Sequence, residues 1–122
     1  AARMDAAATA KRQGVKFSIH SDAPVTPLGP LFTAWCAVNR QTASGRILGE
    51  HEKISVEEAL HAITIGAAYT IKLDHLVGSI ECGKFADFAV LEDNPYEIPP
   101  EYLKDIGVWG TVVSGIPYPK EK

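Results

Sequence analysis

A helix that runs directly into an alternating segment is the feature that most constrains the fold of this chain. Residues 1–13 are rich in alanine and end on Lys11 and Arg12, and they are followed by Gly14, which suits a left-handed helix cap. From residue 15 to residue 20 apolar and polar side chains alternate, which predicts a β-strand. A helix that enters a strand through a tight turn is typical of a parallel α/β unit, so we expect an α/β fold.

Two more helices are predicted downstream. One begins near Pro30, a residue suited to the first helical position, and repeats apolar side chains at helical spacing. The other begins at the capping box Ser55–Glu58, and its apolar spacing continues to Ala67. The polar segment 41–53 between these helices is predicted to be an exposed excursion.

The pattern of the chain changes near residue 75, where short apolar runs separated by turn-forming residues replace the helical spacing. Strands are expected at 85–91, 108–113 and 116–118. The pair Ser114-Gly115 suits a two-residue hairpin loop. We therefore expect two unlike parts, an α/β part over residues 1–75 and a mostly β part over residues 76–122.

Composition excludes two kinds of partner. With 12 basic and 15 acidic residues the formal net charge is -3, so no basic surface for nucleic acid is expected. No apolar run approaches the roughly 20 residues that a membrane helix requires, so no membrane partner is expected either. Cys36 and Cys82 lie far apart, and we expect buried free thiols rather than a disulfide.

The first residues bear on localisation. The chain opens on Ala1 without an initiator methionine, inside a predicted helix, so we expect a piece of a longer, soluble protein. Its cellular location stays open between the cytoplasm and export.

The segment His20-Ser21-Asp22-Ala23-Pro24 follows the predicted strand, where α/β folds gather their active sites. A carboxylate at this position can bind a metal ion or carry a proton between water and a leaving group. Alternatively, Asp22 simply caps the turn through its own backbone, as an aspartate before a proline-rich loop often does. The residues alone leave both roles open for Asp22.

Four segments resemble motifs of the amidohydrolase superfamily, in the order that the family has them. They are GVKFSIHSDAPV (14–25), PLFTAWCAVNR (30–40), ISVEEALHAITIGAAY (54–69) and GSIECGKFADF (78–88). The resemblance covers nearly the whole chain and is nearest to the YtcJ-like, amidohydrolase-3 type branch. One position departs from the pattern, since Cys82 stands where the family usually has proline.

The resemblance implies a fold and an activity. The fold would be the last helix–strand–helix units of a (β/α)8 (TIM) barrel, followed by the C-terminal part of a small β-sandwich. The parent enzyme would use a divalent metal, zinc in our interpretation, and a metal-activated water. Its substrate would be a small molecule with a non-peptide C–N bond of the amide or formamide type.

The resemblance also suggests roles for single residues. Asp22 matches the aspartate after the last barrel strand, which binds metal or acts as acid and base. His20 and Pro24 are expected to line the pocket, and Asp87 is expected to make a structural hydrogen bond.

The other metal ligands of the family have no counterpart in this chain. His51, His61 and His75 show no ligand spacing, and we expect them at the surface. We therefore expect the chain alone to bind no catalytic metal and to be inactive. The alternative is a non-catalytic structural module that self-associates as a homo-oligomer, because a broken barrel would leave strand edges uncovered.

Overall fold

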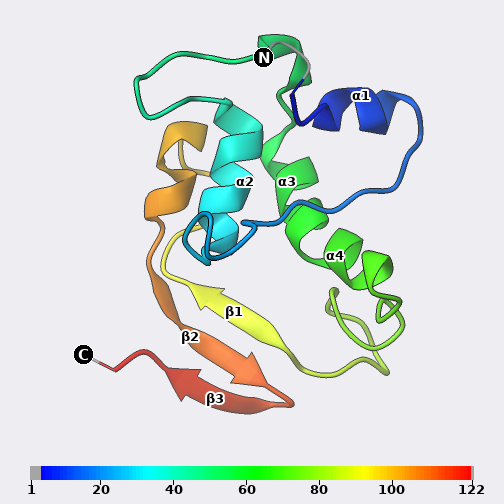
Figure 1. The fold of residues 1–122 in the computed structure, drawn as a ribbon. Coiled ribbons are helices and arrows are strands. Elements are labelled where there is room, and N and C mark those ends of the chain that lie inside the picture. The colour runs from blue at the N-terminus through cyan, green and yellow to red at the C-terminus, as the bar shows by residue number, and fades with distance from the viewer. Residues whose placement is uncertain (1–3, 122) are drawn as a thin grey trace.

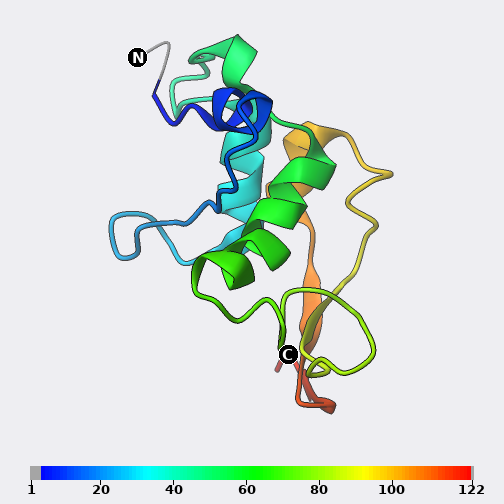
Figure 2. The same ribbon diagram turned by 90° about the vertical axis from the view of Figure 1, so that its right-hand side faces the viewer.

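The structure, a computed structural model, describes residues 4–121 and combines short helices with one antiparallel sheet (Figure 1). The α-helices are α1 (Ala7–Arg12), α2 (Pro30–Asn39), α3 (Val56–Ile63) and α4 (Ile65–Thr70). Two 3-10 helices are η1 (Glu50–Glu52) and η2 (Pro100–Asp105). The strands are β1 (Phe88–Leu91), β2 (Val108–Val113) and β3 (Ile116–Pro119). The expected mixture of helices followed by strands is therefore present, with the helices in one half of the molecule and the sheet in the other (Figures 1 and 2).

The hydrophobic core lies around α2. Trp35 and Val38 lie three residues apart on this helix, as the apolar spacing requires, and both are buried. Leu103 of η2 is fully buried in the same cluster, and the indole N–H of Trp35 donates a hydrogen bond of 2.7 Å to the carbonyl oxygen of Glu101. Both η2 and α3 pack on α2, so this helix connects the part of the chain before residue 75 with the part after it.

The start of the chain differs from the prediction of a helix over residues 1–13. Residues 1–3 lie outside the described part of the chain, and α1 begins only at Ala7, after a turn in which Asp5 has φ 49°. The helix ends as predicted, with Gly14 in the left-handed region at φ 68°.

The predicted strand over residues 15–20 is wrong for this chain. The described residues provide no strand that pairs with this segment, which instead runs beside helices. The alternation of apolar and polar side chains predicts a strand, but a strand also needs a neighbour for its backbone hydrogen bonds.

The continuous helix predicted from Ser55 to Ala67 is two helices. The capping box is confirmed, because the Ser55 side chain accepts from the Glu58 backbone N–H and the Glu58 carboxylate accepts from the Ser55 N–H. The break falls at Thr64, with φ -115° and ψ -98°, where the hydroxyl donates to the carbonyl oxygen of Leu60 over 2.7 Å. Such hydroxyl bonds compete with the helical backbone. Apolar spacing continues across the break and therefore does not reveal it.

The sheet has the order β1-β2-β3 with antiparallel neighbours. The predicted two-residue loop is confirmed, since Ser114 and Gly115 both have positive φ, as a tight hairpin of this kind requires. Asp87 makes the structural hydrogen bond that was predicted: its Oδ1 accepts from the backbone N–H of Ser114 over 2.6 Å. The contact fixes the hairpin loop to the residue before β1.

Both cysteines are free, as predicted, but only one is sheltered from solvent. Cys36 on α2 is half-buried, whereas Cys82 is exposed in the turn before Lys84, so the prediction of a buried thiol is wrong there. Within residues 4–121, every helix is too short or too polar to cross a bilayer.

Candidate functional site

The segment that leads to the candidate site is held against α4 by a close backbone approach. A Cβ atom on Gly66 would lie 2.9 Å from the carbonyl oxygen of Phe17, so only glycine allows this distance. One residue further, the Thr70 hydroxyl donates to the Ser18 hydroxyl over 3.2 Å. Phe17 also packs against the core cluster. Helix and core together therefore fix residues 17 and 18, just before the turn that carries the candidate site residues.

That turn is closed by the backbone of Asp22. The carbonyl oxygen of Asp22 accepts from the N–H of Val25 over 2.8 Å, and the N–H of Asp22 donates to Nδ1 of His20 over 3.0 Å. The Thr26 hydroxyl donates to the carbonyl oxygen of Ser21, which ties the loop back to the segment. Asp22 has φ 53°, a left-handed conformation that aspartate tolerates better than most residues.

The carboxylate of Asp22 has no partner among residues 4–121. Asp22 is exposed, and no hydrogen bond or ion pair in the described part of the chain involves its side-chain oxygens. The alternative that Asp22 caps the turn through its own backbone agrees with these bonds, which backbone groups and His20 make without the carboxylate. The oxygens are free to accept a proton or a metal ion.

A depression of about 410 Å³ lies between α1, α2 and the segment before the turn, and His20 is on its border. Cys36 of α2 and Arg40, the residue that follows this helix, line its other side. Burial raises the pKa of the Cys36 thiol, which keeps it protonated at neutral pH and disfavours a nucleophilic role. Pro24 and Asp22 do not line this depression and lie on the exposed turn next to it.

Asp22 provides a free carboxylate for a metal ion, but the described residues do not complete a site. Among residues 4–121 no group of three or more His, Cys, Asp or Glu side chains is arranged to hold an ion. His51, His61 and His75 are exposed on separate elements. Zinc needs three or four converging ligands, so Asp22 can only be one contributor to a site that other residues complete.

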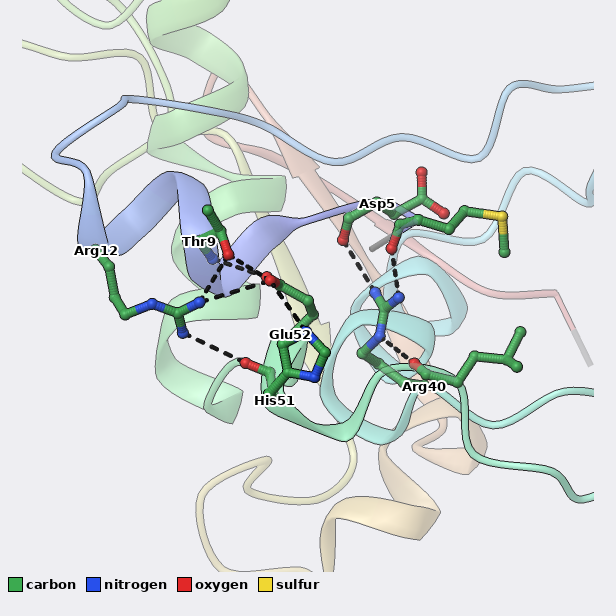
Figure 3. A network of polar contacts seen from close by, with 8 residues as sticks. Asp5, Thr9, Arg12, Arg40, His51 and Glu52 are labelled. Atoms are coloured by element: carbon green, nitrogen blue, oxygen red, sulfur yellow. Dashed lines mark hydrogen bonds and ion pairs between the residues drawn. The ribbon is translucent and has the colours of Figure 1, made fainter. Parts of the chain in front are cut away.

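A second polar cluster was not foreseen from the sequence, and Figure 3 shows it. The predicted excursion 41–53 is exposed over most of its length, but Glu52 within it is only 1% exposed. Its carboxylate accepts from the backbone N–H of Thr9 over 2.8 Å and from the Thr9 hydroxyl, with Arg12 3.5 Å away. The hydrogen bond from the Thr9 hydroxyl lowers the pKa of Glu52, and burial opposes this shift in part.

Arg40 extends this cluster on the other side of α1. Its guanidinium donates to the carbonyl oxygens of Met4 and Asp5, before α1, and to that of Leu48 over 2.6 Å. The contacts of Glu52 attach α1 to the excursion 41–53, and those of Arg40 attach the residues before α1 to the C-terminal end of α2. Since α1 leads through Gly14 into the site segment, they position the chain that carries Asp22. Apart from the bond to Leu48, the contacts join residues 35–43 positions apart, so no periodicity in the sequence signals them.

Residues 1–117 match the Amidohydrolase family, and the chain belongs to this family. It is 35% identical over 103 residues to N-substituted formamide deformylase of Arthrobacter pascens, covering 84% of this chain and 19% of that protein. It is likewise 35% identical over 106 residues to YtcJ of Bacillus subtilis, covering 84% of this chain and 20% of that protein. The chain thus spans about a fifth of the length of the curated relatives it matches.

The fold is similar to a solved structure from the same class. The crystal structure of an amidohydrolase from Thermotoga maritima matches with a TM-score of 0.67 and 22% identity. The match covers 90% of this chain and 24% of that one. The arrangement of helices and sheet is therefore that of about a quarter of an amidohydrolase.

Proposed function

We propose that this chain is the C-terminal part of a metal-dependent amidohydrolase and that Asp22 carries the proton in its reaction. The observation that supports the proposal is the free, exposed carboxylate of Asp22, presented by a turn that its own backbone closes. Residues 1–75 are proposed to form the last units of a (β/α)8 barrel, and residues 76–122 part of a β-sandwich. Active sites of such barrels lie where strands end, and in the proposed complete barrel the segment before Asp22 would pair as such a strand.

The proposed reaction is hydrolysis of a non-peptide C–N bond in a small amide or formamide. A divalent metal, zinc in this proposal, supplies when bound a water whose pKa is lowered to about 7. In the complete enzyme the carboxylate of Asp22 would take up a proton from the attacking water as its oxygen bonds to the carbonyl carbon, and would return this proton to the nitrogen of the leaving amine as the C–N bond breaks. The substrate class is supported by the name of the relative from Arthrobacter pascens, an N-substituted formamide deformylase.

The isolated chain is proposed to be inactive, because the carboxylate of Asp22 alone cannot hold an ion. Catalysis would need the further ligands that a complete enzyme brings to Asp22. This division of the site makes the chain a necessary part of the enzyme and not an enzyme by itself.

The test replaces Asp22 by asparagine in the complete enzyme. Asp22→Asn preserves the size of the side chain but cannot take up a proton, so turnover of a formamide substrate should fall by roughly 10²–10⁴-fold. Asp93→Asn, at an exposed turn before Asn94, is the matched control and should keep full activity. Turnover of Asp22→Asn within a few fold of the unchanged enzyme would contradict the proposal.

A second candidate function is self-association through the sheet. Cross-strand pairing places Val113 opposite Ile116, and the strand alternation puts Trp109 and Tyr118 on the same face, each of the four being 47–57% exposed. An apolar face of this kind favours contact with a second copy of the chain. Light scattering should then show a dimer or larger species that Ile116→Lys returns to a monomer. A monomer over the whole concentration range would exclude this candidate.

A further inference from the structure

We propose that His20 is a positioning residue, whose imidazole holds the backbone of Asp22 in the conformation that presents the carboxylate. The inference rests on the proposed function of Asp22. It gives His20 a specific role beyond its position on the border of the depression.

The backbone of Asp22 adopts a left-handed conformation. At φ 53° the backbone occupies a region that disfavours residues with a side chain, and glycine or asparagine is the usual occupant. Aspartate tolerates this region better than most residues, but the conformation still costs free energy that local contacts offset. The direction of the carboxylate depends on this backbone conformation, because the Cα–Cβ bond turns with it.

Two hydrogen bonds hold the backbone of Asp22 in this conformation. The peptide groups next to Asp22 make two hydrogen bonds, one from the N–H of Val25 to the Asp22 carbonyl and one from the Asp22 N–H to Nδ1 of His20. The first bond is an ordinary turn bond that any residue could make. The second depends on a side chain, at 3.0 Å, and it is the one that the sequence can lose by a single substitution.

The imidazole of His20 acts as a hydrogen-bond acceptor in this contact. Nδ1 accepts the bond, so the proton of the neutral ring is on Nε2. An acceptor one bond beyond Cγ is what the turn requires. Asparagine also carries an acceptor oxygen on Cγ, whereas leucine has a methyl group there.

These differences define a matched pair of variants in the complete enzyme. His20→Leu removes the acceptor and His20→Asn keeps one at the equivalent position. His20 is exposed, so neither change leaves a cavity in the core. His20→Ala serves as a second variant without an acceptor, in case leucine disturbs the fold.

The first readout is the exchange of the Asp22 amide proton with water, followed by NMR in metal-free enzyme labelled with 15N-aspartate. A hydrogen-bonded amide is protected, so exchange should be about tenfold or more faster in His20→Leu and His20→Ala than in the unchanged enzyme. In His20→Asn it should stay close to the unchanged value.

The second readout is the kinetics of the metal-loaded enzyme. Loss of a group that orients a reacting residue typically costs roughly 10–100-fold in activity, and we expect this loss in kcat with KM changed by less than about threefold. His20→Asn should restore most of the lost kcat. A structural role alone would not give this split together with rescue by asparagine.

The outcomes separate the inference from the function on which it rests. Unchanged amide exchange and kcat in both His20→Leu and His20→Ala, together with an inactive Asp22→Asn, would overturn the inference and leave the proposed function standing. An active Asp22→Asn would overturn the proposed function, and the positioning role would fall with it. Equal loss of kcat in His20→Leu and His20→Asn would also overturn the inference.

Discussion

Glu52 Oε2 accepts a hydrogen bond of 2.8 Å from the backbone N–H of Thr9, although 43 residues separate the two in the chain. This N–H lies in the first turn of α1, where the helix leaves its own donors without partners. A carboxylate from a distant 3-10 helix therefore caps α1 in place of a local side chain. The bond joins the start of the described chain to the segment before α3.

Glu52→Gln should destabilise the fold because it removes the charge from a buried, hydrogen-bonded group. We expect the thermal midpoint to fall by on the order of 5–10 °C. Calorimetry on purified protein measures the change. Glu50→Gln is the control on the same 3-10 helix: its side chain is 81% exposed and pairs only with Lys53, so the midpoint should move by less than about 2 °C. Equal shifts for the two variants would contradict the importance of the Glu52 contacts.

The same carboxyl group should make stability depend on acid pH. The pKa of Glu52 is lowered in the folded chain from an ordinary value of 4.5, mainly by the Thr9 hydroxyl, so on acidification the unfolded chain takes up the proton first. The contribution is fully present above about pH 4.5 and is lost as pH falls through the lower folded pKa. Urea unfolding between pH 6 and pH 3 should show a smaller loss of stability in Glu52→Gln than in the unchanged chain. Glu81, whose pKa is lowered chiefly by a hydrogen bond with Lys84, is present in both proteins and cancels in the comparison.

Gly66→Ala should destabilise the chain, although alanine is a better helix former than glycine. The new Cβ would lie 2.9 Å from the carbonyl oxygen of Phe17 and 3.1 Å from that of His61, so the site segment or α4 must move. The cost of overpacking, about 1–3 kcal/mol, should exceed the helical gain of about 1 kcal/mol. Denaturant unfolding tests this. At Gly29 the nearest atom to a new Cβ is 3.5 Å away, so Gly29→Ala should change stability by less than about 1 kcal/mol. A stabilised Gly66→Ala would show that the close approach does not exist.

Leu103→Ala should be among the most damaging single changes. The side chain is fully buried where η2 meets α2, and its loss leaves a cavity that costs about 2–5 kcal/mol. The neighbouring Tyr102 is 57% exposed, and Tyr102→Ala should cost less than half as much. Equilibrium unfolding of both variants provides the comparison. A smaller loss for Leu103→Ala than for Tyr102→Ala would place the core elsewhere.

Asp87 allows a test of the hairpin. Asp87→Asn keeps an oxygen that can accept from the Ser114 N–H, whereas Asp87→Ala leaves this donor to water. We expect a loss of about 1 kcal/mol for alanine and less than half of that for asparagine. Urea unfolding midpoints of the two variants decide the matter. Equal losses in both would show that the carboxyl group acts through its charge instead.

Local patterns in the sequence were sufficient to predict much of the fold. The capping box at Ser55, proline at the start of α2 and the Ser114-Gly115 loop are all signals that lie within a few residues, and the structure has each of them. The amidohydrolase resemblance rested on such short segments in a fixed order, and the family match over residues 1–117 confirms it.

Features that depend on distant partners were not predictable from one sequence. The alternating segment 15–20 has the pattern of a strand, but pairing needs a neighbour that the described residues do not provide. The burial of Glu52 depends on Thr9, and nothing in the polar segment 41–53 distinguishes Glu52 from the exposed Glu50. For the candidate site, the role of Asp22 stays a prediction; the bond from its N–H to His20 is local but was not foreseen, because it depends on the geometry of the turn.

We propose that Asp22 belongs to a metal site that residues outside this chain complete. The direct measurement is metal content by mass spectrometry on the purified 122-residue chain and on the complete enzyme, after both have been equilibrated with zinc and desalted. We expect about one or two zinc ions for each molecule of the complete enzyme and less than about a tenth of a zinc ion for each 122-residue chain. Stoichiometric zinc on the 122-residue chain alone would contradict it, since the described residues would then hold an ion without the rest of the enzyme.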